Sequence, residues 1–280
     1  MIKAILLDID GTLTNSQKEI TPRTRDALLR AQKAGTRLVL ASGRPAQGLH
    51  SFARKLDMFN YHGIFCCFNG AKVMDCQTDE VYFNQTITVD QAKRVLEHIK
   101  QFDIVPVIDQ GPYMHTTNVF FKVPNAQGEI FQVIEYEARN NGYLLKEHVD
   151  LAAHIDWEPN KILTAGVPAY LNDHAAQISA PFGDELNAMF TAPYYFEFTP
   201  KGVDKAKALE ESLGKLGITA QETVAFGDAQ NDMTMLAFAG CGVAMGNAVE
   251  ETKAAADMIT DDCDHDGIAC ALEKLMPELF

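Results

Sequence analysis

The stretch IKAILLDIDGT, residues 2–12, opens the chain and decides the kind of fold that we expect. Its first six residues form an almost unbroken apolar run, and a glycine follows two aspartates. A short apolar run that ends in a turn residue is typical of a strand buried on both faces of a parallel sheet. Asp8 and Asp10 would then lie at the carboxyl end of that strand, where open α/β sheets bind their ligands. Two carboxylates in such a place are costly unless a cation compensates them, and a divalent ion would do so.

The same pattern of apolar run, polar turn and helix repeats along the chain. Thr21 is expected to cap a helix that begins at Pro22 and that Gly35 closes. Further strands are expected at residues 37–41, 64–68, 223–226, 241–245 and 258–260. Helices are expected between them and at residues 203–216, 233–239 and 267–276. This alternation predicts an α/β fold with a doubly wound, mostly parallel sheet.

The middle of the chain has a different texture. Short strand candidates separated by Gly, Pro and Asn lie at residues 105–108, 114–119, 162–166 and 194–198. Helices are expected at residues 89–102, 128–140 and 169–180. We therefore predict an α/β core formed by residues 1–83 and 199–280, interrupted by an inserted α+β domain of residues 84–198 with a largely antiparallel sheet.

The composition limits the partners. The chain has 280 residues, 38 of them acidic and 24 basic, and a formal net charge of −14. Nucleic acid is not expected as a partner, because proteins grip its phosphates with basic patches. The six cysteines lack zinc-like spacing, which indicates reduced thiols and a cytoplasmic protein. No apolar run approaches the ~18 residues of a membrane span and no signal-peptide pattern opens the chain, so no membrane partner is expected.

Polar residues gather at the predicted strand ends, and a lysine starts a predicted helix. They are Asp8, Asp10, Ser42, Asn69, Asp228, Asn231, Asp232 and Lys205. Carboxylates can bind Mg²⁺ and supply a nucleophile and an acid, while a lysine and a hydroxyl can hold a phosphate group. The set therefore fits phosphoryl transfer on a small phosphorylated metabolite, with Mg²⁺ as the cofactor.

These residues resemble the ordered motifs of the haloacid dehalogenase (HAD) superfamily of phosphatases. The matching stretches are DIDGTL (8–13), SGR (42–44), Lys205 and GDxxND (227–232). NGA (69–71), GNA (246–248) and DGI (266–268) are similar to the Cof-like subfamily, in which a large α/β cap of class IIB lies between the second and third motifs. The resemblance covers the whole core. It implies a HAD-like Rossmannoid core and makes the insertion a cap that selects the substrate.

The resemblance also implies roles. Asp8 would be the nucleophile that becomes an aspartyl-phosphate, and Asp10 would be the general acid and base. Mg²⁺ would be held by the carboxylates of Asp8 and Asp228 and by the backbone carbonyl of Asp10, with Asp232 supporting the metal site or the lysine. The phosphate group would be held by Ser42, the amide of Gly43, Lys205 and Asn231. Repulsion among the carboxylates should raise the pKa of one of them, and the acid role requires this one to be Asp10.

Several assignments have alternatives. Lys201 is a nearby rival of Lys205, although the register of residues 202–209 favours Lys205. Arg44 would contact the substrate or the cap, or would only brace its loop. Asn69 would contact the substrate or would only turn the chain after a strand.

The function also has alternatives. Besides a Mg²⁺-dependent phosphatase, a sugar phosphomutase would use the same nucleophile, and a receiver-like phospho-acceptor module would use a similar acidic pocket. Sugar phosphates, pyridoxal phosphate and nucleotides remain open as substrates, and the sequence does not indicate an oligomeric state. In the inserted domain, His115 is expected to be structural or exposed and not catalytic, and Lys161 is expected at the surface.

Overall fold

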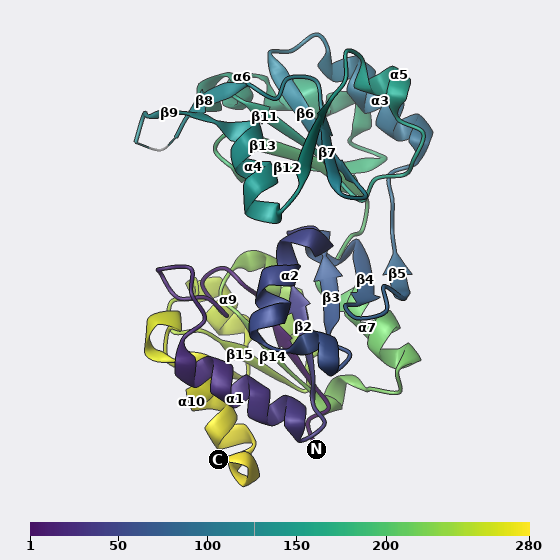
Figure 1. Ribbon diagram of the computed structural model, residues 1–280. Coiled ribbons are helices and arrows are strands. Elements are labelled where there is room, and N and C mark those ends of the chain that lie inside the picture. Colours follow the sequence, from purple (N-terminus) through teal and green to yellow (C-terminus); the bar gives the residue numbers. More distant parts are fainter. Residues whose placement is uncertain (126) are drawn as a thin grey trace. The chain divides into compact units, whose positions relative to one another are not determined.

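The computed structural model describes residues 1–125 and 127–280, which divide into two compact units. The first unit comprises Met1–Asn84 and Asp204–Phe280, and the second, inserted unit comprises Gln85–Val203 (Figure 1). The second boundary follows strand β13 (Tyr195–Pro200), which continues beyond residue 198 and belongs to the sheet of the inserted unit.

An eight-stranded sheet in the order β16-β15-β14-β1-β2-β3-β4-β5 forms the centre of the first unit. Its strands are β1 (Ala4–Leu7), β2 (Arg37–Ala41), β3 (Ile64–Cys67), β4 (Lys72–Asp75), β5 (Val81–Asn84), β14 (Thr223–Gly227), β15 (Cys241–Ala244) and β16 (Met258–Ile259). The pairs from β16 through β3 are parallel, whereas β3–β4 and β4–β5 are antiparallel. The predicted α/β fold with a mostly parallel sheet is confirmed, and the two antiparallel strands at its edge were not predicted.

Helices cover this sheet. They are α1 (Pro22–Lys33), α2 (Ala46–Lys55), α7 (Lys205–Lys215), α8 (Met233–Phe238), α9 (Glu250–Ala255) and α10 (Gly267–Leu275). Thr21 caps α1 as predicted, since its side chain accepts a hydrogen bond from the amide of Thr24 at 3.4 Å. Leu209 of α7 and Leu236 of α8 pack with Leu6 of β1 in one apolar core. Figure 1 shows α1 and α10 side by side, and the two helices are in contact.

The turn after β3 approaches the start of α7 closely. Asn69 and Gly70 both have positive φ, +56° and +103°. A β carbon on Gly70 would lie 2.5 Å from the carbonyl oxygen of Asp204 and 2.9 Å from the amide nitrogen of Lys205. Only glycine leaves room for this approach, which sets the position at which α7 begins.

The inserted unit is built on a six-stranded sheet in the order β10-β7-β6-β11-β13-β12. Its remaining strands are β6 (Ile104–Gln110), β7 (Tyr113–Thr116), β10 (Leu144–Glu147), β11 (Ile162–Gly166) and β12 (Leu186–Ala192), and β8 (Lys122–Pro124) pairs separately with β9 (Ile130–Gln132). β10 runs parallel to β7, whereas the other neighbours in the six-stranded sheet are antiparallel. The sheet is largely antiparallel, as expected.

The helices that accompany this sheet in the described part of the unit are α3 (Val89–Ile99), α4 (Val133–Asn141), α5 (Leu151–His154) and α6 (Pro168–Ser179). The helix expected from residue 128 begins only at Val133, because residues 130–132 form β9. The early start was therefore wrong, since an isolated apolar run does not distinguish a strand from the first turn of a helix.

The surface position expected for Lys161 is wrong. Its side chain is only 14% exposed, and its Nζ lies 3.1 Å from Oε2 of Glu197, which is 3% exposed. The carboxylate comes from β13, the neighbour of β11 in the sheet, and this pairing is not visible along the sequence.

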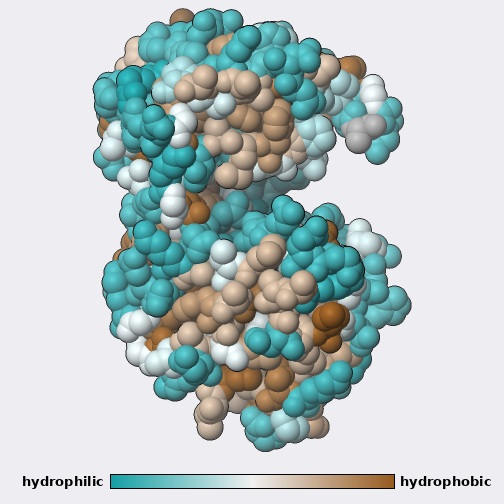
Figure 2. All heavy atoms as spheres, turned by 180° about the vertical axis from the view of Figure 1, so that it is seen from behind, coloured by the Kyte–Doolittle hydropathy of each residue, from teal (hydrophilic) through white to brown (hydrophobic). Residues whose placement is uncertain are grey.

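Apolar side chains also reach the surface, as Figure 2 shows from behind. The large apolar side chains that are exposed include Met189 and Phe190 of β12. Within residues 1–125 and 127–280, no helix has both the length and the apolar character that crossing a membrane requires.

Replacing Gly70 should destabilise the first unit more than a positive φ alone explains. Gly70→Ala adds a clash with the Asp204 carbonyl, and we expect it to lower the free energy of unfolding by about 3 kcal/mol. Gly217 has a φ of +69° and no atom within 4 Å of an added β carbon, so Gly217→Ala should cost only about 1 kcal/mol. Urea denaturation, followed by circular dichroism, measures the free energy of unfolding of both variants. Equal losses in the two variants would contradict the close approach of Gly70 to Asp204.

Candidate active site

A buried lysine lies at the centre of the predicted site. Lys205 is the first residue of α7 and is 1% exposed. Its Nζ donates to Oδ1 of Asp8 at 2.9 Å, to Oδ1 of Asp232 at 2.6 Å and to the carbonyl oxygen of Ala41 at 3.0 Å. The rival, Lys201, is exposed and belongs to the inserted unit.

Parallel pairing brings three carboxylates together. Leu7 of β1 lies opposite Phe226 of β14, so the residues that follow these strands leave the same edge of the sheet. Each of Asp8, Asp228 and Asp232 places a carboxylate oxygen within 4.8 Å of the others. Oxygen donors of this kind suit Mg²⁺, and the single charge of Lys205 does not balance three carboxylates. The residues therefore fit the divalent cation that the sequence predicts.

Asp232 has a different environment from the other two. Its Oδ2 accepts hydrogen bonds from the amides of Asp228 and Ala229, both at 3.1 Å, while its Oδ1 is held by Lys205. A β carbon on Gly227 would lie 2.4 Å from Cβ of Asp232, which explains the glycine before Asp228. Asp232 thus braces the loop and the lysine, and this leaves the carboxylates of Asp8 and Asp228 better placed to ligate an ion.

Asp8 carries a shifted pKa. Burial raises the pKa of its carboxyl group from 3.8 to about 7; Lys205 opposes this effect, and the nearby charges of Asp232 and Asp228 add to it. A buried carboxylate with too little positive charge around it favours its protonated form. A bound divalent cation would reverse this preference.

Asp10 lies in the opposite electrostatic environment. Its Oδ2 accepts hydrogen bonds from Nη2 of Arg44 at 2.9 Å and from Nε at 3.2 Å, and its Oδ1 accepts one from Lys18 at 3.0 Å. Burial acts to raise the pKa of Asp10, but Arg44 and Lys18 together outweigh it and lower that pKa. The expected rise in the pKa of Asp10 is therefore wrong for this structure, because the charge count along the sequence omitted these two cations.

The remaining predicted residues form one connected group. The buried Ser42 accepts a hydrogen bond at its Oγ from the amide of Arg44 at 3.3 Å, and its carbonyl accepts one from the amide of Asn69 at 2.9 Å. Asn231 donates from Nδ2 to Oδ1 of Asn69 at 3.1 Å. A β carbon on Gly43 would lie 3.1 Å from Nδ2 of Asn69. Asn69 therefore turns the chain and also holds Asn231. Its contact with the substrate stays a prediction.

Four residues at the site were not predicted as site residues. Thr12 donates to Oδ1 of Asp228 at 2.7 Å, and Gly11, with φ of +86°, leaves room for Oδ2 of the same carboxylate. Asn247 donates to the carbonyl of Gly11 at 2.8 Å. Lys18, the fourth, donates a hydrogen bond to Asp10 at 3.0 Å, beside Arg44. The motifs DIDGTL and GNA contain three of them, but no sequence pattern marks Lys18.

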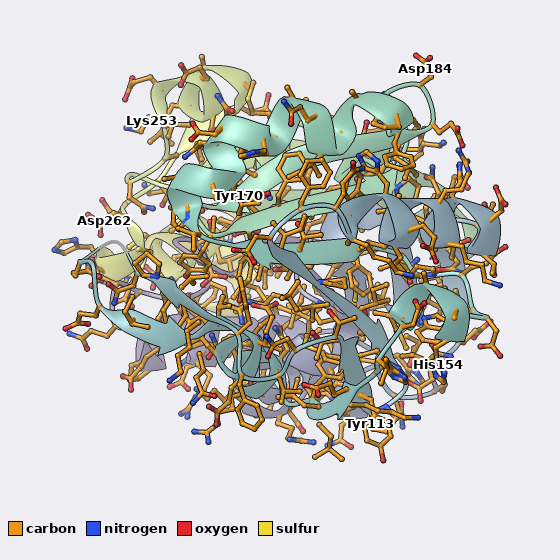
Figure 3. The ribbon with its side chains drawn as sticks, turned by 90° about the horizontal axis from the view of Figure 1, so that it is seen from above. Tyr113, His154, Tyr170, Asp184, Lys253 and Asp262 are labelled. Atoms are coloured by element: carbon orange, nitrogen blue, oxygen red, sulfur yellow. The ribbon has the colours of Figure 1, made fainter. Side chains whose placement is uncertain are left out.

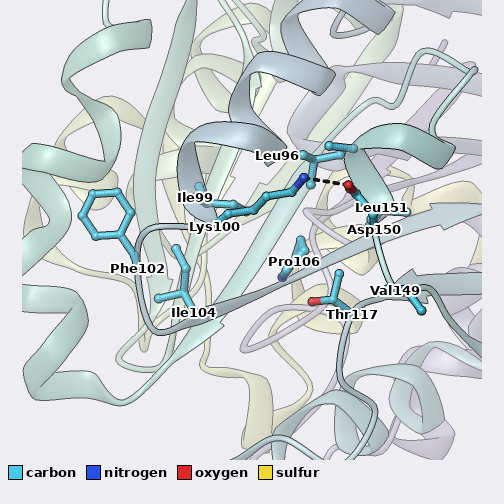
Figure 4. A pocket seen from close by; sticks show the side chains of 11 residues that line it. Leu96, Ile99, Lys100, Phe102, Ile104, Pro106, Thr117, Val149, Asp150 and Leu151 are labelled. Carbon is cyan, nitrogen blue, oxygen red and sulfur yellow. Dashed lines mark hydrogen bonds and ion pairs between the residues drawn. The ribbon is translucent and has the colours of Figure 1, made fainter.

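A cavity in the inserted unit has a different character from the acidic cluster. This cavity of about 480 Å³ is lined by Leu96, Ile99, Lys100, Phe102, Ile104, Pro106, Thr117, Val149, Asp150, Leu151 and Ala152 (Figure 4). Nζ of Lys100, which lines this cavity, lies 2.9 Å from Oδ2 of Asp150 and 2.8 Å from Oε1 of Glu97. A mostly apolar cavity with a neutralised cation suits a phosphate group poorly, so the acidic cluster is the better candidate for phosphoryl chemistry.

An open, mostly parallel sheet with an acidic cluster and a buried lysine at its strand ends defines an enzyme of the phosphoryl-transfer type. A family model for haloacid dehalogenase-like hydrolases matches residues 5–272, and the chain belongs to this family. The match confirms the resemblance seen in the motifs.

Individual relatives agree. The putative phosphatase YxeH of Bacillus subtilis is 29% identical, over 99% of each chain. A haloacid dehalogenase-like hydrolase from Bacteroides thetaiotaomicron superposes with a TM-score of 0.90 at 34% identity, covering 99% of this chain and 100% of its own. The HAD subclass IIB sugar phosphatase BT4131 superposes with a TM-score of 0.77 at 25% identity, covering 99% and 100%.

The pKa of Asp8 predicts how stability depends on pH without metal. A pKa raised in the folded state contributes stability below about pH 4, which is lost as the pH rises through about 7. Between pH 4 and 8, the free energy of unfolding of the wild type should therefore fall by roughly 2 kcal/mol or more relative to Asp8→Asn. Urea denaturation in EDTA measures this difference. A constant offset between the two proteins across this range would contradict the raised pKa.

Proposed function

We propose that this hydrolase is a Mg²⁺-dependent phosphatase that acts on a small phosphorylated metabolite through an aspartyl-phosphate on Asp8. The observation that carries the proposal is the placement of Lys205 between Asp8 and Asp232, with Asp228 beside them. This arrangement orients one carboxylate and leaves a cluster that requires a divalent cation. The phosphatase names of its relatives support the same reaction.

The two aspartates after β1, Asp8 and Asp10, would perform different tasks in the reaction. A carboxylate oxygen of Asp8 attacks phosphorus, and the bond from phosphorus to the ester oxygen breaks as Asp10 gives its proton to the leaving alcohol. Asp10 then takes a proton from water, whose oxygen attacks phosphorus and releases Asp8 and inorganic phosphate. Ser42, the amide of Gly43, Lys205 and Asn231 would hold the phosphate oxygens.

The carboxylates of Asp8 and Asp228, with the backbone carbonyl of Asp10, would hold Mg²⁺. When bound, the ion supplies positive charge that offsets the carboxylates and stabilises the transferring phosphoryl group. Thr12 would orient Asp228 toward the ion through its hydrogen bond at 2.7 Å. Lys205, together with the ion, would favour the ionised form of Asp8, and its hydrogen bond would keep the carboxylate aligned for attack.

Arg44 would connect substrate binding to the proton on Asp10. Its guanidinium group pairs with Asp10 through Nε and Nη2, a geometry that a phosphate can also accept. An arriving phosphate dianion would compete for Arg44 and weaken its hold on Asp10. The pKa of Asp10 would then rise when its proton is required.

We propose a sugar phosphate as the substrate class, with pyridoxal phosphate and nucleotides as the alternatives to be tested. The relative BT4131 is named a sugar phosphatase, and it covers almost all of this chain. Residues of the inserted unit would select the leaving group, as in a cap domain. The cysteine composition supports a cytoplasmic location.

Activity against p-nitrophenyl phosphate tests the nucleophile and the metal. Asp8→Asn should lower kcat by about 10³-fold or more, because a neutral amide is a far weaker nucleophile than a carboxylate. Excess EDTA should abolish turnover, and added Mg²⁺ should restore it. Asp264→Asn is the matched control, since Asp264 contacts Ser16 at the surface and should leave kcat unchanged.

Four results would overturn the proposal. Full activity of Asp8→Asn or full activity in EDTA would remove the nucleophile or the metal from the mechanism. A sugar phosphate that returns as its isomer, with no inorganic phosphate released, would identify a phosphomutase. A stable acyl phosphate after one turnover would identify a phospho-acceptor module.

The pairing of Arg44 with Asp10 predicts a change in the pH profile. Because Arg44 lowers the pKa of Asp10 in the free enzyme, Arg44→Gln should move the alkaline limb of kcat/KM to higher pH and should raise KM for the phosphate ester. Arg54→Gln is the control, because Arg54 is exposed and lies on α2, the helix that follows Arg44. An unchanged limb together with an unchanged KM would show that Arg44 only braces its loop.

A further inference from the structure

Three histidines of the inserted unit converge outside the acidic site. They are His115 on β7, His148 just after β10 and His154 at the end of α5. A ring nitrogen of each lies within 4.8 Å of those of the other two. Figure 3 labels His154 and Tyr113, which lie on the same side of this unit.

The backbone fixes where these side chains start. β10 pairs with β7 in parallel, so that Lys146 lies opposite His115, and the amide of His148 donates to the carbonyl of Thr116 at 2.9 Å. Asp150 caps α5 through a hydrogen bond from the amide of Ala153 at 3.1 Å. The three rings therefore come from a sheet register and a capped turn, and not from unconstrained loops.

The distances are close to those of a tetrahedral site. Nδ1 of His115 lies 2.8 Å from Nε2 of His148, whereas two nitrogens on one zinc ion are about 3.3 Å apart. The rings of His148 and His154 stack with centroids 3.9 Å apart. If Nδ1 of His115 and Nε2 of His148 moved apart by about half an ångström, they would reach the spacing of two zinc ligands. A rotation of the exposed His154 ring would then direct the nitrogen lone pairs of all three rings toward one point.

His115, the buried member of the cluster, is held in the neutral form that binds a metal ion. Burial, together with the neighbouring charges of His148, Lys146 and His154, lowers the pKa of His115 to about 4. Neutral imidazole is the form that ligates. The hydrogen bond between His115 and His148 places a proton between them, and that proton can move to the other nitrogen of the same ring when an ion takes its place.

We propose that His115, His148 and His154 bind a divalent transition-metal ion of the Zn²⁺ class. Imidazole nitrogen suits Zn²⁺, Co²⁺ and Ni²⁺, whereas Mg²⁺ prefers oxygen, so the two sites select different ions. Three protein ligands leave the fourth position to water. This site is independent of the proposed phosphatase reaction.

Binding would also fix one wall of the cavity in the inserted unit. Val149, Asp150 and Leu151 line that cavity, and two ligands, His148 and His154, flank them in the sequence. An ion would tie both ends of this segment to His115 on β7. The site would therefore control the shape of the cavity shown in Figure 4.

The tryptophan beside the cluster provides the readout. Trp157 is the single tryptophan of the chain, and its ring lies 4.8 Å from that of His115 and 6.1 Å from that of His154. Co²⁺ bound to the histidines should quench its fluorescence in a saturable, one-to-one manner. The titration is done on the full chain in excess Mg²⁺, which occupies the acidic site.

His148→Gln and His154→Gln should each weaken Co²⁺ binding on the order of tenfold or more. His98→Gln is the matched control, because His98 lies on α3 and contacts the carbonyl of Gln177. Zn²⁺ should displace Co²⁺, and it should raise the melting temperature of the wild type more than that of His154→Gln. The melting curves without metal also verify that each variant folds.

The proposal is overturned if His154→Gln and the wild type are quenched at the same Co²⁺ concentration. It is equally overturned if Asp8→Asn abolishes the quenching, since the acidic site would then be the one that binds Co²⁺. Loss of phosphatase activity in Asp8→Asn with intact quenching would separate the two sites.

Discussion

The active-site edge of the sheet depends on one buried ammonium group. Lys205 joins the end of β1, the carbonyl of Ala41 at the end of β2, and Asp232 in the loop after β14. Removing one partner of such a buried set leaves a charge without compensation, at a cost of about 3–5 kcal/mol. Two carboxylates on one lysine, with Asp228 close by, also leave an excess of negative charge. The contacts of Lys205 thus order the loops and also gather an excess of negative charge that a cation would offset.

Asp8 and Asp10 show how two identical side chains acquire different chemistry. Asp8 is 8% exposed and faces other carboxylates, whereas Asp10 extends toward Arg44 and Lys18. Their pKa values move in opposite directions, and such a separation is a mark of distinct catalytic tasks. In the absence of metal and substrate the order is the reverse of the one that the proposed reaction requires. The ligands themselves would therefore have to set the final protonation states.

Much of the core followed from the sequence, because buried parallel strands are continuous apolar runs and their polar ends meet at one edge. The position of Lys205 among the polar strand ends followed from the motif pattern, whereas its direct contact with Asp8 did not. Contacts between long side chains did not follow: nothing in the sequence places Lys18 on Asp10 or Lys161 beside Glu197. The histidine cluster could not be predicted from the sequence either, because it depends on the register of β10 against β7.

The pairing of β1 with β14 has a consequence for synthesis on the ribosome. All strands of the inserted unit's sheets lie within residues 85–203, so this unit can complete its pairings before the rest of the chain has been made. β1 is made before the other strands of its sheet and can pair early with β2, yet its partner on the other side begins only at Thr223. Until Lys205 emerges, the nascent core also lacks the cation that compensates Asp8. The earliest strand of this sheet is thus enclosed on both sides only late in synthesis.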